Sequence, residues 1–406
     1  MSIASAGTSP AAEGGAARYV IEGALFGAFV AVLCLLQNRF ASTAYDNYTL
    51  LADAFLHGHV WVDIPGTYID AQAYNGRYYM IEAPFPALLM MPLVATLGHA
   101  ANQTFLAVGL CALAAGVAWE TCRHLGLGFA RTLFLAAFFV WGTDLAWCAL
   151  YGDVWFVAHV ATVAFTMLAL REIVGRRRGW LVALWAAAAC ESRFSLVLAV
   201  PVYAAMLYAL DADPRRRLRN LATFASVFVP VAVSHVAYNI ARWGGPRDIG
   251  YTLWYHEDPI GETSGSPFRL SYVPDELYSF FLRAPKFYAQ YPYVAVDRYG
   301  LSLPFTSPAL VFAFFAGRPR RIVAALWLAV ALVAIPSVAY YANGTSQFGM
   351  RHALDFEPFL FVLMVLAARR AFGWPIIVAI VYSISTGFWG IWFWDHYLRS
   401  LAKGSW

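Results

Sequence analysis

The sequence predicts an all-α polytopic membrane protein, and two observations carry that prediction. Hydrophobic residues make up 61% of the 406 residues and charged residues only 13%, which leaves too little polar surface to cover a water-soluble fold. Apolar segments near the roughly 20 residues that cross a hydrocarbon core recur along the whole chain. We therefore expect one integral-membrane domain over 1–406 rather than an anchor joined to a soluble domain.

Eleven segments are expected to cross the membrane, the first of them a retained helix rather than a cleaved signal peptide. A twelfth apolar segment, 83–98, is short and contains three prolines. A crossing there would move the arginine clusters at 176–178 and 215–217 to the outside, against the positive-inside rule, so we predict a helix on the outer membrane surface. The predicted spans are 19–38, 104–122, 131–149, 155–172, 179–193, 195–211, 221–241, 303–316, 322–341, 354–368 and 373–393.

The charges predict which side carries the chemistry. With these spans the cytoplasmic side holds 16 basic and 6 acidic residues, and the outer side holds 12 basic and 18 acidic residues. Two outer loops, 39–103 and 242–302, are longer than the connection of helices requires. Loops of that size on a rigid scaffold commonly carry function, so we expect 39–103 to be a catalytic loop. The two lysines among many arginines and alanines indicate a bacterial source and its inner or plasma membrane.

The first loop contains five acidic residues before position 92: Asp46, Asp53, Asp63, Asp70 and Glu82. Asp46 lies nearest the first span, where a carboxylate could take a proton from an acceptor hydroxyl while a lipid-borne donor approaches from the bilayer. From this residue alone, a solvated acid or a helix cap is the more frequent explanation. Tyr48 and Glu82 are expected to position substrate, although Glu82 could instead complement the dipole of the surface helix.

Asp153 and His159, in the segment YGDVWFVAH, are expected on the outer side. Asp153 is the second catalytic candidate, because His159 could be a satisfied histidine inside a helix. With Asp46, Glu82 and His256 of the segment WYHEDP, Asp153 supplies ligand types that suit a divalent ion, but no metal-ligand spacing is present. A divalent metal is the one cofactor that the sequence leaves open.

Arg193 and Arg351 are the candidate ligands for a lipid-linked phosphate. Arg193 and Glu191 lie at the tip of a predicted helical hairpin, where ionisable side chains are costly unless they are paired or functional. They could partner each other or nearby helices. A planar, permanently charged guanidinium suits phosphate oxygens, and Arg351 of the segment SQFGMRHALDFEP offers a second one. Either arginine could instead anchor a helix end.

These features resemble the GT-C glycosyltransferases that use polyprenyl-phosphate sugars, including protein O-mannosyltransferases and lipid A aminoarabinose transferases. In those families the first outer loop contains juxtamembrane helices and carries a catalytic aspartate near its start, where Asp46 lies here. Glu82-Ala83-Pro84 is similar to the Glu-Lys-Pro run that ends their first loop, with alanine in place of lysine. Arg193 occupies the place of a basic residue at their helix tip, and Asp153 resembles their second acidic position.

The resemblance implies transfer of a sugar, with inversion, from a polyprenyl-phosphate donor to a glycan, lipid or protein of the cell envelope. It places this reaction on the extracytoplasmic face, with the donor, the acceptor and membrane lipids as partners and no nucleic acid. Two other classes stay open: a transporter or flippase of lipid-linked sugars, and a ligase that moves a whole glycan from a polyprenyl diphosphate. A transporter predicts charges through the membrane depth, whereas here the acids gather on one side.

Overall fold

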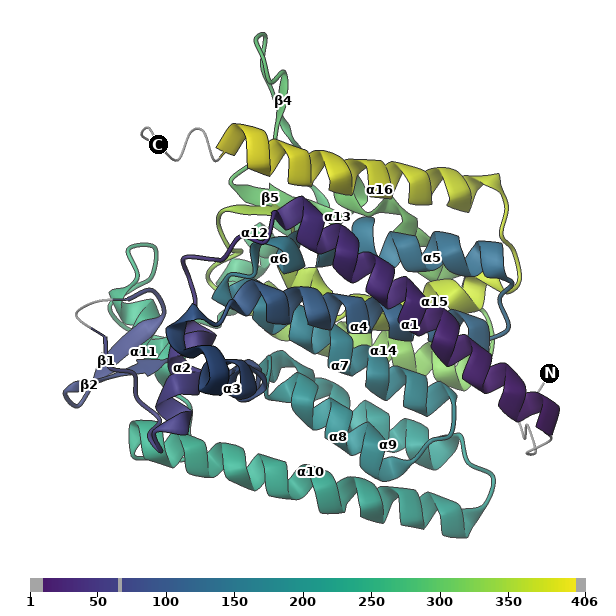
Figure 1. The fold of residues 1–406 in the computed structure, drawn as a ribbon, viewed down its shortest axis with the longest axis horizontal. Helices are drawn as coiled ribbons and strands as arrows, with labels where there is room; N and C mark the ends of the chain where they lie inside the picture. The colour runs from purple at the N-terminus through teal and green to yellow at the C-terminus, as the bar shows by residue number, and fades with distance from the viewer. Residues whose placement is uncertain (1–9, 65–67, 399–406) are drawn as a thin grey trace.

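The helices form one bundle whose longer connections collect at one end (Figure 1). The computed structural model describes residues 10–64 and 68–398. Within these residues, 6 helical segments are long and apolar enough to cross a membrane, and a seventh is formed by a pair that bends by 48°. The six are Ala17–Asn38 in α1 (Pro10–Asn38), α4 (Gln103–His124), α7 (Val154–Val174), α10 (Pro214–Trp243), α14 (Arg320–Ala339) and Trp374–Tyr397, which joins α16 (Trp374–Phe393) to η6 (Trp394–Leu398). The bent pair is α5 (Phe129–Trp141) and α6 (Leu145–Tyr151).

Shorter apolar helices occupy the other four predicted spans. The 12 residues of α8 measure about 18 Å at 1.5 Å per residue, less than the roughly 30 Å of a hydrocarbon core. All eleven predicted segments are therefore helical, and the all-α polytopic architecture is confirmed. These shorter helices are α8 (Gly179–Cys190), η2 (Phe194–Ala199) with α9 (Val200–Ala209), α13 (Leu303–Thr306) with η4 (Pro308–Phe315), and α15 (Glu357–Ala368).

Local chemistry sets several helix ends. The Thr104 N–H donates to the side chain of Asn102 at 2.9 Å, which caps the start of α4. Asp213 caps α10 in the same way, and Pro214 follows it at the first helical position, where no N–H is needed. The same helix ends at Gly244, whose φ of 73° is the left-handed value that favours glycine.

Glycines allow α1 and α4 to approach closely. A Cβ added to Gly23 would lie 2.6 Å from the carbonyl oxygen of Gly116, and one added to Gly27 would lie 2.6 Å from that of Ala112. Small residues at such contacts are a general route to helix association in membranes, where lipid is as apolar as the side chains. The first helix is thereby fixed against the bundle, and so is the point at which the first loop begins.

One end of the bundle, here called the basic end, gathers the arginines of the short connections. The Arg216 guanidinium donates to the carbonyl of Arg176 at 2.8 Å, and Arg177 donates to the carbonyl of Leu210. Arg131 donates to the carbonyl of Ala368 at 3.3 Å. The arginine clusters therefore lie together on one side of the bundle, as the predicted topology requires.

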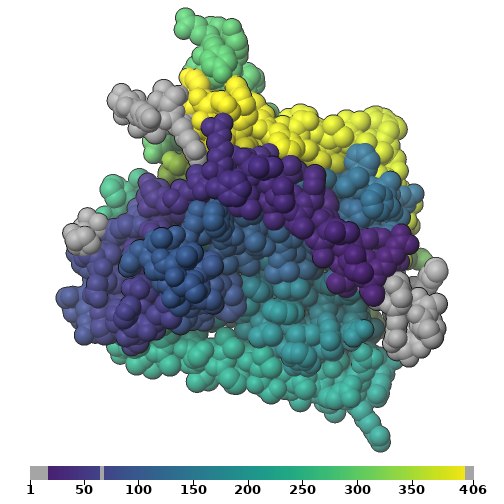
Figure 2. Space-filling model, viewed as in Figure 1, coloured from purple at the N-terminus to yellow at the C-terminus, as the bar shows by residue number. Residues whose placement is uncertain are grey.

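The opposite end, here called the loop end, is built by the two long loops. Figure 1 shows α2, α3, β1, β2 and α11 together at the left, and in Figure 2 the first loop and α3 cover this end on the face shown. The predicted surface helix 83–98 corresponds to α3, which packs beside α2. The first loop comprises α2 (Asn47–Leu56), β1 (Ala71–Tyr74), β2 (Arg77–Met80), α3 (Phe85–Leu97) and η1 (Gly98–Ala100). The second comprises α11 (Gly250–Glu257), η3 (Leu270–Tyr272), α12 (Val273–Phe281), β3 (Lys286–Phe287), β4 (Val294–Ala295) and β5 (Tyr299–Leu301).

Because α1 and α4 are in close contact, the effect of a substitution in α4 on stability should depend strongly on whether the residue faces α1. Gly116→Leu should lower the stability by about 1–3 kcal/mol or more, because the new side chain would meet the backbone of Gly23. Gly109→Leu in the same helix is the control, since no atom lies within 4 Å of an added Cβ there. Thermal unfolding in detergent micelles measures both. Equal melting temperatures for the two variants would contradict this packing.

Candidate active site

The site is assembled at the loop end by segments far apart in the sequence. Strand β5 pairs in parallel with β6 (Gln347–Gly349), with Leu301 opposite Gly349. Immediately after β6 the chain forms the short helix η5 (Arg351–Asp355), which leads into α15. This pairing ties the end of the second loop to the segment that carries Arg351.

Asp355 binds Arg193 and a histidine in the interior of the protein. Its carboxylate is fully buried and accepts hydrogen bonds from Arg193 Nε at 2.9 Å, His159 Nδ1 at 2.8 Å and Ser195 Oγ at 2.7 Å. Arg193 therefore pairs with Asp355 and not with Glu191. The partner of Glu191 is His235, at 2.9 Å. The Asp355 carboxylate therefore neutralises Arg193 and fixes its Nε edge.

Arg351 has no such counter-ion. Its side chain is only 8% exposed, its Nε has no hydrogen-bond partner, and its one hydrogen bond is a long one of 3.4 Å to the carbonyl of Thr345. Its guanidinium lies 5.9 Å from the ring centre of Trp155 and 5.4 Å from that of Phe156. Burial lowers the pKa of Arg351 and the positive charge of Arg193 acts in the same direction, whereas Cys148, Asp144 and Asp70 oppose the shift. Among the described residues, Arg351 is a buried cation without an ion-pair partner, a state that favours binding of an anion.

His352 lies beside these arginines and is also buried. Its ring is 5.4 Å from that of His159, and its Nε2 has no partner. Burial lowers the pKa of His352 well below its ordinary value, and Arg193 and His159 act in the same direction. His352 is therefore neutral and adds no second positive charge next to Arg351.

Two carboxyl groups of the first loop form a buried pair next to Arg351. Asp70 and Glu82 are each 4% exposed, and a hydrogen bond joins their side chains. The Trp155 indole N–H also donates to Asp70. Burial raises the pKa of Asp70, opposed by its hydrogen bonds with Glu82 and Trp155 and by Arg351, while burial and then the charge of Asp70 raise that of Glu82 well above its usual value. Asp70 and Glu82 are here called the carboxyl pair.

The predicted positioning residue Tyr48 lies in this neighbourhood. It is buried in α2, and its hydroxyl has no hydrogen-bond partner in the described structure. Burial raises its pKa, and the neighbouring Glu82 acts in the same direction, whereas Arg193 opposes the shift. The structure therefore brings four of the predicted site residues together: Tyr48, Glu82, Arg193 and Arg351.

Asp46 immediately precedes α2, whereas both members of the carboxyl pair follow that helix in the first loop. It is half-buried and accepts a hydrogen bond of 2.6 Å from the hydroxyl of Tyr68. Burial and the hydrogen bond to Asp46 both raise the pKa of Tyr68. Asn47 binds the carbonyl of Ile69 at 2.7 Å, which fixes the start of α2 beside the segment that leads to Asp70. The role of Asp46 as a base stays a prediction.

Asp153 holds the chain that leads to Asp46. It precedes α7 and accepts a hydrogen bond from the Thr43 hydroxyl, while the N–H of Val154 donates to the carbonyl of Tyr45 at 3.1 Å. These contacts give Asp153 a positioning function at the start of the first loop.

His256 lies away from the other candidates. Its Nε2 binds the carbonyl of Gly265 at 3.0 Å within the second loop. Asp46, Asp153 and Glu82 each have a different immediate partner: Tyr68, Thr43 and Asp70, respectively. The described parts of the chain contain no group of three or more His, Cys, Asp and Glu side chains placed to hold a metal ion. The divalent metal stays a prediction, and no step is assigned to it.

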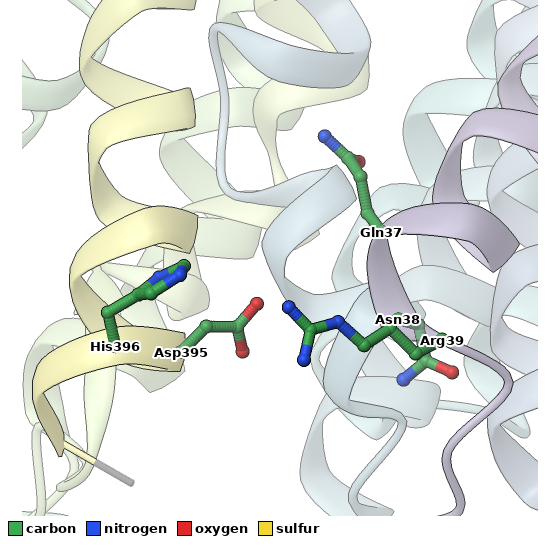
Figure 3. A pocket seen from close by; sticks show the side chains of 5 residues that line it. All are labelled: Gln37, Asn38, Arg39, Asp395 and His396. Atoms are coloured by element: carbon green, nitrogen blue, oxygen red, sulfur yellow. The ribbon is translucent and has the colours of Figure 1, made fainter. Parts of the chain in front are cut away.

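A separate pocket lies near the ends of α1 and α16 (Figure 3). It has a volume of about 180 Å³, and the side chains of Arg39 and Asp395 point toward one another across it. Gln37, Asn38 and His396 complete its lining. None of these residues belongs to the arginine and carboxyl groups described above, so this pocket is not the candidate active site.

Sequence reasoning missed Asp70 and Asp355 as site residues. Asp70 has a recognisable signal, because the Asn75-Gly76 turn joins β1 to β2 with positive φ at both residues, as a tight hairpin requires. The resulting register places Ala71 opposite Met80 and so brings Asp70 close to Glu82. Asp355 has no local signal, because its partners His159 and Arg193 are distant in sequence.

A solved structure shares this fold. The crystal structure of ArnT from Cupriavidus metallidurans bound to undecaprenyl phosphate aligns with 86% of this chain at a TM-score of 0.52 and 14% sequence identity. The aligned part is 60% of that chain, so this protein spans somewhat less than two thirds of its length. No protein-family model and no curated protein matches the sequence. The similarity confirms the predicted GT-C fold, and the chain is an integral membrane protein of that fold class.

The buried Asp355 predicts a large loss of stability when its charge is removed. Asp355→Asn should lower the free energy of unfolding by about 2–4 kcal/mol, because Arg193, whose side chain is 20% exposed, would lose its counter-ion and the fully buried site would lose its negative charge. Asp53→Asn is the control: Asp53 pairs only with the exposed His57 and His99 and should contribute at most about 1 kcal/mol. Denaturation in detergent compares the two variants. A loss for Asp355→Asn no larger than that for Asp53→Asn would contradict the assigned role.

Proposed function

We propose that this protein is a membrane glycosyltransferase that moves a sugar from a polyprenyl-phosphate donor to a cell-envelope glycan, lipid or protein. Its GT-C fold and the buried cationic site at the loop end support the proposal. The solved structure that it resembles carries undecaprenyl phosphate, which is the kind of ligand that such a cationic site suits.

The observation that carries the proposal is the buried guanidinium of Arg351, which forms no ion pair with any described residue. A buried cation without a direct ion-pair partner is expensive to maintain, and such charges commonly mark a binding site. The phosphodiester of a lipid-linked sugar carries one negative charge and would compensate it. As the sugar leaves, charge accumulates on the phosphate, so Arg351 and Arg193 would bind the transition state more strongly than the ground state.

Asp46 is the proposed base for the acceptor hydroxyl. It is a half-buried carboxylate at the start of the first loop, oriented by the Tyr68 hydroxyl. The acceptor oxygen would attack the anomeric carbon as its proton passes to Asp46, while the bond to the phosphate oxygen breaks on the opposite face. This geometry inverts the anomeric centre. Asp153 would keep Asp46 in place through Thr43.

The distribution of charge supports an outward-facing enzyme. The arginine clusters occupy the basic end, which the positive-inside rule assigns to the cytoplasm, and the carboxyl pair lies at the other end. A transporter or flippase would need charged groups along a crossing pathway. Their concentration at the loop end favours transfer at the extracytoplasmic face, in a bacterial inner or plasma membrane.

Product analysis tests the proposed reaction directly. Purified protein in lipid nanodiscs would be incubated with undecaprenyl-phosphate-linked sugars, undecaprenyl-diphosphate-linked glycans and extracted envelope acceptors, with products identified by mass spectrometry. We expect transfer from a monophosphate donor. Transfer from the diphosphate alone would identify a glycan ligase. Movement of either lipid between leaflets without any new glycosidic bond would identify a flippase.

The variant Arg351→Gln should lose affinity for the lipid phosphate without losing stability. Loss of a charge-assisted hydrogen bond should weaken undecaprenyl phosphate binding about 10- to 100-fold, whereas removal of an unpaired buried charge should leave the melting temperature unchanged or higher. Arg283→Gln is the matched control, because Arg283 pairs with Asp297 at 3.5 Å and with Ser279 at 2.8 Å. That variant should lose stability and retain binding. Wild-type affinity in Arg351→Gln would refute the assigned phosphate contact.

Asp46→Asn predicts a loss of transfer without a loss of donor binding. The amide cannot accept the proton, so turnover should fall by about 10²–10⁴-fold while the affinity for undecaprenyl phosphate is retained. Asp63→Asn in the same loop provides the control, since Asp63 is 83% exposed. Normal turnover in Asp46→Asn would eliminate this residue as the base.

A further inference from the structure

We propose that the carboxyl pair of Asp70 and Glu82 is the acid of this reaction, with Glu82 delivering a proton to the departing lipid phosphate. This inference rests on the proposed glycosyl transfer and assigns a second catalytic group to the same site. It gives the two carboxyl centres of the first loop opposite tasks, because Asp46 would accept a proton where the carboxyl pair would donate one.

Burial and hydrogen bonding require a shared proton. Both carboxylate oxygens of Glu82 are shielded from solvent and accept no hydrogen bond from an N–H donor or hydroxyl of the described residues, and the neighbouring side-chain partner of Glu82 is the carboxyl group of Asp70. Two ionised carboxylates in contact without water would repel each other strongly, so the pair holds one proton and one negative charge.

The surroundings place the proton on Glu82. Asp70 accepts the indole N–H of Trp155 and lies within the electrostatic range of Arg351, and both contacts stabilise its ionised form. Glu82 has no comparable donor: Arg242 lies in its vicinity but is bound to Asp248 at 2.8 Å. The other ionisable groups that face Glu82 are Tyr48 of α2, Tyr238 of α10 and Tyr251 of α11.

Trp155 connects the carboxyl pair to the phosphate site. Its indole N–H binds Asp70, and its ring lies 5.9 Å from the guanidinium of Arg351. A phosphate held by Arg351 would therefore lie next to the pair. Asp70 also has a φ of 56°, which is unusual for a residue other than glycine and fixes its carboxylate at the end of the hairpin.

The protons and electrons of the proposed step balance. The acceptor oxygen forms a bond to the anomeric carbon, and its proton passes to Asp46. The bond from that carbon to the phosphate oxygen breaks, its electron pair remains on the phosphate, and the proton of Glu82 moves to that oxygen. Polyprenyl phosphate leaves as a monoanion. Asp46 then releases its proton to solvent, and the carboxyl pair regains one.

The environments explain why these acids would differ. Asp46 is half-buried and accepts a hydrogen bond from the Tyr68 hydroxyl, which orients its carboxylate. Glu82 is buried against a second carboxyl group, which suits a neutral acid. Opposite environments for two carboxyl groups in one site are the usual basis for separate acid and base functions.

The pH dependence of turnover in Glu82→Gln tests the proposal. Wild-type turnover should fall as the pH rises, because the carboxyl pair loses its proton. Glu82→Gln keeps the shape of the side chain but cannot supply a proton, so turnover should be about 100-fold lower and lack the alkaline decline. Affinity for undecaprenyl phosphate, measured on the same preparation, should be retained and shows that the variant is folded.

Two further variants separate the acid from its surroundings. Asp70→Asn removes the negative charge that raises the pKa of Glu82, so the alkaline decline should move to lower pH instead of disappearing. Glu276→Gln in α12 is the matched control: Glu276 is another buried glutamate, and burial raises its pKa to about 8. This variant should keep both the rate and the pH profile of the wild type.

The outcomes distinguish this inference from the proposed function. Infrared spectra should contain a protonated-carboxyl band that is lost in Glu82→Gln and shifted in Asp70→Asn. Wild-type transfer with an unchanged rate and alkaline decline in Glu82→Gln would overturn the acid assignment and leave the glycosyltransferase intact. Absence of transfer by the wild-type protein with every donor would instead refute the proposed function, and the acid assignment with it.

Discussion

The buried charge of Arg351 is the constraint on which the site depends. Removing a guanidinium from water costs several kcal/mol unless a counter-ion replaces the lost hydration. Asp355 supplies that compensation to Arg193, and no equivalent carboxylate contacts Arg351 in the described structure. The second loop fixes the segment that leads to Arg351 through the pairing of β5 with β6. An anion that binds here completes an electrostatic arrangement that the protein alone leaves incomplete.

Three carboxyl environments in the candidate site residues account for three different functions. Asp355 is fully buried and saturated with donors, so it organises Arg193 and His159 and is not available to a substrate. Asp46 is half-buried and has a single side-chain donor, Tyr68. The carboxyl pair is buried but shares its proton internally. The same chemical group thus serves as a structural ion, a proposed base and a proposed acid according to burial and partners.

Much of this organisation could be predicted from the sequence, because it depends on local patterns. The apolar segments predicted the helices, and the charge asymmetry predicted that the arginine clusters would lie at one end. Arg193 and Arg351 could be selected because permanently charged residues beside apolar segments are conspicuous. The pairing of Asp355 with Arg193 could not be predicted, since it depends on how distant helices pack. A related limit applies to His256. Its residue type suits a functional site, but its side chain binds the carbonyl of Gly265 within the second loop.

A structure of the protein with undecaprenyl phosphate in lipid nanodiscs would test the central claim most directly. The account predicts that the phosphate lies within hydrogen-bonding distance of Arg351, with Arg193 and the carboxyl pair around it. A phosphate bound instead at the Arg39 pocket, with Arg351 still unpaired, would contradict it.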